Sequence, residues 1–144
     1  MSGKGLLELQ LLKGKLTHDT EMLGKMSPYI TLVYKQKKHK SKVHHEGGKT
    51  PIFGDKFTFE VSSATEDITM RVWDLDLTTS DAVGFCQIKI ASLIINNGVE
   101  DWFDIYFDNK NAGSIQLRTK FEPEGGDQYE NMMKDFQEQN LRLQ

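Results

Sequence analysis

This sequence has almost no cysteine, and it lacks the signals that send a chain into the secretory pathway. Cys86 is the single cysteine among 144 residues, so no internal disulfide can form. No Asn-x-Ser/Thr acceptor for N-glycosylation occurs, and the N-terminus lacks the long apolar core of a signal peptide. These absences indicate a reducing compartment, and we expect a cytoplasmic protein in which Cys86 is buried and inert.

Long hydrophobic runs are also missing. No stretch approaches the roughly 18 apolar residues that a membrane-spanning helix needs. Glycine stands at position 3 rather than position 2, where an N-myristoylation signal requires it. We therefore expect any contact with a membrane to be peripheral and reversible.

The patterns that mark common enzymes do not occur either. The chain has no Ser-His-Asp order, zinc quartet, glycine-rich phosphate loop or nucleophile elbow. Nine lysines lie between residues 13 and 49 of a chain whose net charge is −3, yet exposed aromatic residues do not alternate with them. We expect neither an enzyme nor a nucleic-acid-binding protein.

What the sequence does contain is alternation of apolar and polar residues over short runs. This period-two pattern is typical of strands that bury one face, and 144 residues with 38% hydrophobic side chains suit one domain with one core. A polar run at 39–45 is expected to pair back through a turn at Lys37-Lys38. The other runs centre on Leu7–Leu11, Ile30–Tyr34, Phe57–Val61, Ile68–Val72, Cys86–Ile90, Trp102–Phe107 and Ile115–Phe121. The prediction is an all-β fold, an eight-stranded antiparallel β-sandwich.

The character of the chain changes near residue 122. Pro123-Glu124-Gly125-Gly126 is typical of a hinge, so we divide the chain into a domain at 1–122 and a hinge with a helical tail at 123–144. Four apolar side chains then follow at helical spacing and predict a short amphipathic C-terminal helix. This helix is expected either to pack on its own sandwich or to bind a groove in a partner protein. The four residues are Tyr129, Met132, Met133 and Phe136.

Three carboxylates, Asp74, Asp76 and Asp81, follow directly on one predicted strand. Like charges on so short a segment repel one another unless a cation lies between them or water screens them. The side chains nearby offer hard oxygen atoms, which calcium prefers and zinc does not. The segment is therefore either a calcium site or a set of solvated turn residues.

Lysines cluster on the hairpin that follows the second predicted strand: Lys35, Lys38, Lys40 and Lys42. Alternate positions on a strand point to one face, so Lys38, Lys40 and Lys42 are expected to form a row. A row of cations attracts an anionic membrane, whereas lysines on an edge strand also prevent sheets from aggregating.

The ordered set of motifs resembles the C2 domain, a calcium-dependent phospholipid-binding β-sandwich, over residues 5–122. It is closest to small single-domain plant-type members, and an opening strand that leads straight into the first acidic loop implies the permuted type II topology. In this family the lysine-rich strands bind phosphoinositides. The motifs are Pro28-Tyr29, Thr50-Pro51-x-Phe53, Phe57-x-Phe59-x-Val61, Val72-Trp73-Asp74-x-Asp76 and Val83-Gly84.

The resemblance also implies a set of calcium ligands, which fall on Glu21, Ser27, Asp74, Asp76 and Asp81. Ser27 stands where the family usually has aspartate, and Glu21 is one methylene longer than the usual side chain. The third loop is also one residue shorter than in the family. Since calcium affinity depends on ligand charge, we expect one weak site held by Glu21, Asp74 and Asp76, with Asp81 next.

The expected function is therefore a non-enzymatic module that binds anionic phospholipid membranes, with this degenerate calcium site as a weak switch. Met22, Leu23 and Leu77 at the loop tips are expected to enter the membrane interface. The alternative is a calcium-independent adaptor between proteins, or a structural subunit of a larger assembly.

Overall fold

The computed structural model describes residues 3–21 and 23–142, and strands make up most of it. Two short helical segments, α1 (Ile90–Leu93) and η1 (Ile95–Asn97), connect β6 to β7, and a longer helix, α2 (Tyr129–Arg142), follows β8. No helix in these ranges is both long and apolar enough to cross a bilayer. The strands are β1 (Gly5–Leu16), β2 (Pro28–Tyr34), β3 (Lys37–Lys40), β4 (Lys56–Val61), β5 (Asp67–Leu75), β6 (Ser80–Lys89), β7 (Glu100–Phe107) and β8 (Lys110–Pro123).

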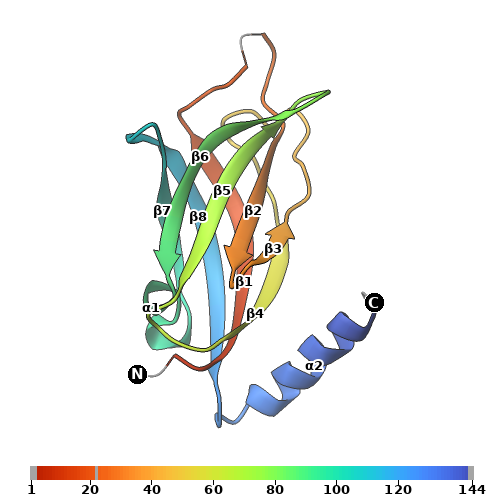
Figure 1. Ribbon diagram of the computed structural model, residues 1–144, viewed down its shortest axis with the longest axis vertical. Coiled ribbons are helices and arrows are strands. Elements are labelled where there is room, and N and C mark those ends of the chain that lie inside the picture. Colours follow the sequence, from red (N-terminus) through yellow and green to blue (C-terminus); the bar gives the residue numbers. More distant parts are fainter. Residues whose placement is uncertain (1–2, 22, 143–144) are drawn as a thin grey trace.

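All paired strands are antiparallel and follow the order β3-β2-β5-β6-β7-β8-β1-β4. Strands β6 and β7 share a single residue pair, Phe85 with Tyr106, so the ladder bends there into two four-stranded layers (Figure 1). The predicted eight-stranded antiparallel sandwich is confirmed. Strand β1 lies between β8 and β4 and leads straight into the loop at 17–27, as the type II topology requires.

The core lies between the two layers and comes from one face of every strand except β3. Burying an aliphatic side chain of this size contributes about 1.5–3 kcal/mol, so the alternation within the strands is what holds the layers together. A rigid sandwich in turn holds the connecting loops at its two ends. Fully buried members include Leu7, Leu9, Leu11, Ile30, Leu32, Ile68, Met70, Val72, Ile115 and Leu117.

Cys86 packs beside this core but is only partly buried. Burial, and then the nearby charge of Asp104, raise the pKa of its thiol to about 12. The thiol therefore stays protonated near neutral pH, and a protonated thiol is a poor nucleophile.

The hairpin between β2 and β3 differs from the prediction. Its turn is at Lys35-Gln36, where both residues adopt left-handed backbone angles (φ 48° and 67°), and not at Lys37-Lys38. Strand β3 covers only Lys37–Lys40 instead of 39–45. Two consecutive left-handed residues form the type I′ turn that suits the twist of a tight hairpin, and this turn starts the return strand two residues early.

Candidate functional site

Asp74, at the end of β5, joins two loops at one end of the sandwich. Its side chain is fully buried. The Thr20 hydroxyl donates to Asp74 Oδ2 at 2.7 Å, and the Ser27 backbone N–H donates to Oδ1 at 2.7 Å. Hydrogen bonds to a carboxylate are among the stronger ones in proteins, so Asp74 ties the loop at 17–27 to β5. In Figure 1 this loop and the turn between β5 and β6 lie at the top.

Asp81 was expected in the acidic loop, and this expectation is wrong. The turn between β5 and β6 contains only residues 76–79, and Asp81 is the second residue of β6. The strand register places Asp81 directly opposite Asp74. Like charges directly opposite each other on antiparallel strands destabilise the pair, so this register brings two repelling carboxylates together.

Glu21, from the loop at 17–27, interacts with the carboxylates of Asp74, Asp76 and Asp81. Its pKa is raised to about 7, first by hydrogen bonding to Asp74, then by the charge of Asp74, by burial and by the charges of Asp76 and Asp81. The pKa of Asp76, an exposed residue, is also raised, first by partial loss of hydration and then by hydrogen bonding to Asp81. The four carboxylates therefore interact closely enough to retain a proton near neutral pH.

The four carboxylates have the oxygen ligands that calcium prefers, but they are not arranged to enclose an ion. All four side chains offer hard carboxylate oxygens, and their mutual repulsion would be relieved by a cation. In the described part of the chain, however, no three His, Cys, Asp or Glu side chains are arranged to hold a metal ion. Glu21 must lose its proton and the loops must draw together before an ion is enclosed, which favours weak binding.

Ser27 lies next to this group but its hydroxyl is used elsewhere. Ser27 Oγ accepts from the backbone N–H of Glu46 at 3.0 Å, which holds the loop between β3 and β4. Both backbone groups of Ser27 form hydrogen bonds with β5. The Ser27 N–H donates to the Asp74 carboxylate, and the Ser27 carbonyl accepts from the Leu75 N–H. The contribution of Ser27 is thus to position Asp74.

Two apolar side chains stand out beside the carboxylates. Leu23 is 90% exposed and Leu77 is 104% exposed, and each lies in one of the two acidic loops. Exposed leucines cost solvation free energy unless something covers them. Met22, the third residue expected at these tips, lies outside the described residues.

The four predicted lysines of the hairpin have different neighbours. Lys38 and Lys40 share the outer face of β3, where Lys40 Nζ lies 4.6 Å from the centre of the Tyr29 ring. Lys35 lies in the turn, and its ammonium contacts Glu66 at 3.4 Å and Ser62. Lys42 follows the end of β3. The structure thus brings together two of the four predicted lysines.

Sequence reasoning missed two residues on this outer face. Thr31 on β2 pairs with Lys40 on one side and with Arg71 of β5 on the other, so Arg71 extends the basic row. Trp73 lies two residues further along β5, and its indole N–H donates to the Thr31 hydroxyl at 3.0 Å. Alternation with Met70 and Val72 indicated that both side chains point outward, but only the register of three strands places them beside the lysines.

The apolar side of α2 faces the sandwich. Tyr129, Met132, Met133 and Phe136 are each partly buried, whereas the other described residues of the helix are exposed. The helix contacts β1 and β8, and Tyr129 and Phe136 line a cleft beside β4. Of the two expected roles for the tail, this arrangement matches packing on its own sandwich.

Comparison with known proteins relates this arrangement to one family. The family model for the C2 domain matches residues 5–105. The chain is 29% identical to "16 kDa phloem protein 2" of Arabidopsis thaliana over 121 residues, which are 83% of this chain and 82% of that protein.

Solved structures agree with this match. The structure of a C2 domain-containing protein superimposes with a TM-score of 0.72 at 28% identity, covering 87% of this chain and 94% of that one. A calcium-bound structure of the paired A and B domains of extended synaptotagmin 2 shares the fold with a TM-score of 0.70 at 19% identity, covering 82% of this chain and 45% of that one. The match spans both acidic segments, the basic hairpin and most of the sandwich, and the chain belongs to the C2 domain family.

Proposed function

We propose that this protein is a non-enzymatic C2 module that binds anionic phospholipid membranes peripherally and uses one weak calcium site as a switch. The observation that carries the proposal is the group of four carboxylates, Glu21, Asp74, Asp76 and Asp81, in which hydrogen bonding to Asp74 and then the neighbouring negative charges raise the pKa of Glu21 to about 7. Exposed Leu23 and Leu77 flank this group. A charged cluster beside exposed apolar tips suits a surface that meets a membrane interface.

Glu21, Asp74 and Asp76 would hold the ion, with Asp81 next to them. Bound calcium would neutralise the loops and accept phosphate oxygens of anionic lipids into its shell. Asp74 is held in position by Thr20 and Ser27, so it needs little rearrangement, whereas Glu21 must give up its proton. Leu23 and Leu77 would then enter the interface and add apolar burial.

The basic outer face supports the same orientation toward a membrane. Lys38 and Lys40 lie on β3 and Arg71 lies on β5, with β2 between them, and Tyr29 and Trp73 are on the same face. Each cation near an anionic surface contributes about 1 kcal/mol, and aromatic rings are favoured at the level of the lipid head groups. Within this proposal, residues 1–122 form the membrane-binding unit and 123–144 the hinge and tail.

The experiment that tests the switch is a calorimetric titration of the metal-free protein with calcium, with and without vesicles that contain phosphatidylserine. Calcium binding that tightens in the presence of vesicles would support the switch, because lipid oxygens complete the ion's shell. No heat and no thermal stabilisation at millimolar calcium would exclude the switch. The protein adaptor would then become the better candidate, with α2 released from the sandwich.

The outer basic face makes a separate prediction. Replacing Lys38 and Lys40 together by glutamine removes two cations and should weaken calcium-independent vesicle binding by about 2 kcal/mol, or roughly 30-fold. Sedimentation with phosphatidylserine vesicles at low and physiological salt measures this. The matched control, Lys120→Gln with Lys134→Gln, loses the same charge from β8 and α2 and should bind nearly as the natural chain does. Equal losses in both variants would contradict a local lysine site.

The raised pKa of Glu21 predicts that protons and calcium compete. The folded chain holds this proton up to about pH 7, above the ordinary value of 4.5, so the metal-free protein loses stability as pH rises between these values. Calcium binding should release the proton and weaken about tenfold between pH 7.5 and pH 6. Calorimetry in two buffers of different ionisation heat measures the release. Glu21→Gln should bind more weakly and show little dependence on pH over this range; a natural chain that binds equally at both pH values would refute the linkage.

A further inference from the structure

Three aromatic side chains at the junction of β6 and β7 form an exposed patch that the calcium loops do not explain. The aromatic patch consists of Phe85, Tyr106 and Phe107, which are 48%, 44% and 40% exposed. Large apolar side chains that gather on a surface in this way mark an interaction site, whereas single exposed ones are ordinary. The patch therefore calls for a partner.

Strand register brings the patch together and joins it to a cation. Arg71 of β5 lies directly opposite Phe85 of β6, and Phe85 lies directly opposite Tyr106 of β7. Residues that are directly opposite each other on paired strands point to the same side of a sheet. Arg71, Phe85 and Tyr106 therefore form one row on the outer face.

A hollow of about 210 Å³ lies beside this row. Small residues, Ala82 and Gly84, line it together with the aromatic rings of Trp73, Phe85 and Phe107. A hollow walled by aromatic rings suits an inserted aromatic side chain. Its volume is below the usual range for small-molecule pockets, which favours the side chains of a protein over a free ligand.

Two charged side chains of opposite sign also line the hollow. Arg71 belongs to β5 and Asp108 follows the end of β7, with β6 between these strands. Both residues are exposed, and neither forms an ion pair with another residue in the described ranges 3–21 and 23–142. The guanidinium of Arg71 lies 5.8 Å from the centre of the Phe85 ring. The patch thus has one positive and one negative edge.

We propose that the aromatic patch is the interface of a homodimer, so that its occupant is a second copy of this chain. An interface around a two-fold axis pairs one patch with itself, and it therefore needs complementary charges within that one patch. An axis between Arg71 and Asp108 sets each arginine against the aspartate of the other copy and the aromatic rings against each other. Aromatic residues and arginine supply most of the binding free energy at protein interfaces.

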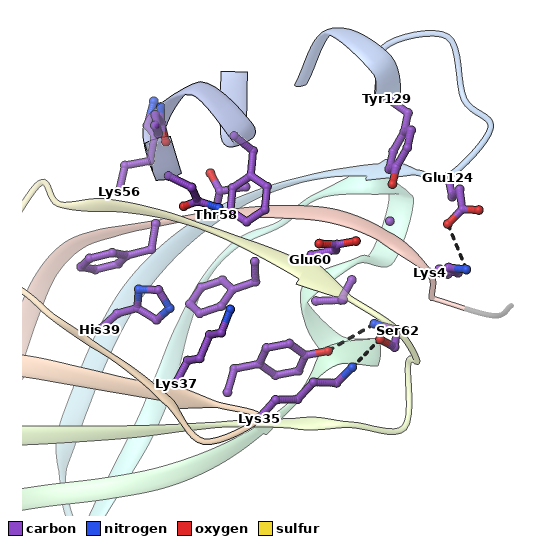
Figure 2. A pocket seen from close by; sticks show the side chains of 18 residues that line it. Lys4, Lys35, Lys37, His39, Lys56, Thr58, Glu60, Ser62, Glu124 and Tyr129 are labelled. Atoms are coloured by element: carbon purple, nitrogen blue, oxygen red, sulfur yellow. Dashed lines mark hydrogen bonds and ion pairs between the residues drawn. The ribbon is translucent and has the colours of Figure 1, made fainter. Parts of the chain in front are cut away.

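The dimer goes beyond the membrane function proposed above and does not depend on it. It covers Arg71 but leaves Lys38 and Lys40 free, because β2 separates β3 from β5. Helix α2 lies elsewhere, since Tyr129 is on the same side of β4 as Thr58 and Glu60 (Figure 2). Among the described residues, none of α2 lines the hollow beside Phe85.

Sedimentation velocity of the full chain without calcium or lipid, from about 1 to 500 µM, tests the dimer over the range of weak interfaces. The average mass should rise from that of one chain toward that of two. Phe85→Ser should raise the concentration at the midpoint about tenfold or more. The matched control is Ile95→Ser, which changes a similarly exposed side chain in η1 and should leave the midpoint unchanged. A natural chain that stays monomeric throughout, or equal effects of the two variants, would overturn the proposal.

Reversing the charges tests the pairing of Arg71 with Asp108. Arg71→Glu and Asp108→Arg each set like charges against each other in a dimer of identical chains, so each variant alone should dimerise about tenfold more weakly or worse. An equal mixture of the two variants should dimerise again, because both contacts in the mixed dimer then join opposite charges. A misfolded variant could not recover in this way. A mixture that stays monomeric would overturn the pairing.

Vesicle binding by Phe85→Ser separates the dimer from the membrane function. The variant keeps the calcium loops and the lysines of β3, so at low concentration, where the natural chain is monomeric, both proteins should bind phosphatidylserine vesicles equally. Weaker vesicle binding by Phe85→Ser, with a natural chain that is monomeric at every concentration, would make the patch a membrane surface and overturn the dimer. Absence of calcium binding would refute the switch and leave the dimer standing.

Discussion

A protein in which Asp74 and Asp76 are both replaced by asparagine is expected to lose calcium-stimulated binding to anionic vesicles. Two of the three carboxylates proposed to hold the ion become neutral, and calcium affinity falls steeply with ligand charge. Sedimentation with phosphatidylserine vesicles, with calcium and with chelator, measures the effect. Calcium-stimulated binding that persists at its natural level would exclude the site.

The controls for this experiment must separate loss of a ligand from loss of structure. Asp74 is buried and accepts hydrogen bonds from Thr20 and Ser27, so an amide there gives up one of two acceptors at a cost of about 1–3 kcal/mol. Asp76→Asn alone avoids this problem, because Asp76 is exposed, and it should still weaken the calcium response. Asp127→Asn with Asp135→Asn changes the net charge equally in the tail and should respond to calcium as the natural chain does.

The largest expected effect on stability is that of Gly113→Ala in β8. Gly113 has a φ of +119°, which side chains rarely adopt, and a β-carbon there would lie 2.1 Å from the backbone carbonyl oxygen of Lys15 on β1. Backbone strain and the clash between two paired central strands together cost about 3–5 kcal/mol. For a domain of this size we expect the Tm to fall by roughly 10 °C or more. Thermal and urea unfolding measure the change.

Gly125 provides the matched control, since it also has a positive φ, +86°, but no atom lies within 4 Å of the position of an added β-carbon. Gly125→Ala should cost only the strain of the left-handed backbone, about 1–2 kcal/mol or less in the hinge. If the two variants unfolded at the same temperature, the close approach of β8 to β1 at Gly113 would be wrong.

Most of the fold could be predicted from the sequence because the signal for a strand is local. Ile68, Met70 and Val72 alternate with polar residues, and all three are fully buried in β5. The same period identified the other strands of the sandwich except β3, and helical spacing identified α2. A side chain on a strand faces the core or the solvent according to whether its position is odd or even, whichever strand becomes its neighbour.

The hairpin shows where local signals fail. Lys35-Gln36 lacks the glycine or asparagine that usually marks a type I′ turn, so the sequence offered no reason to place the turn there. The displacement was two residues, which keeps odd and even positions on their faces, so Lys38 and Lys40 do share one face as predicted. It also moved Lys35 into the turn and left Lys42 beyond the end of β3.

Part of the candidate site could likewise be predicted from the sequence, and part could not. Composition and spacing alone identified Asp74, Asp76 and Asp81 as an acidic group, and resemblance to the C2 family added Glu21 and Ser27. Only the tertiary structure decided that Asp81 lies on β6 opposite Asp74, and that Asp74 is buried under hydrogen bonds from the other loop. Strand register and loop packing depend on contacts between residues far apart in the chain, for which a short window of sequence carries no information.

The sequence by itself therefore determined the class of fold, the strands, the amphipathic helix and the family to which the chain belongs. The tertiary structure decided which charged groups meet: four carboxylates at one end, and Arg71 on the same outer face as Lys40, across β2 from it. The physical reason is the distance along the chain over which each property is set. Burial patterns repeat along the chain at the period of each element, whereas electrostatic neighbours are set by the order and register of strands across the whole sandwich.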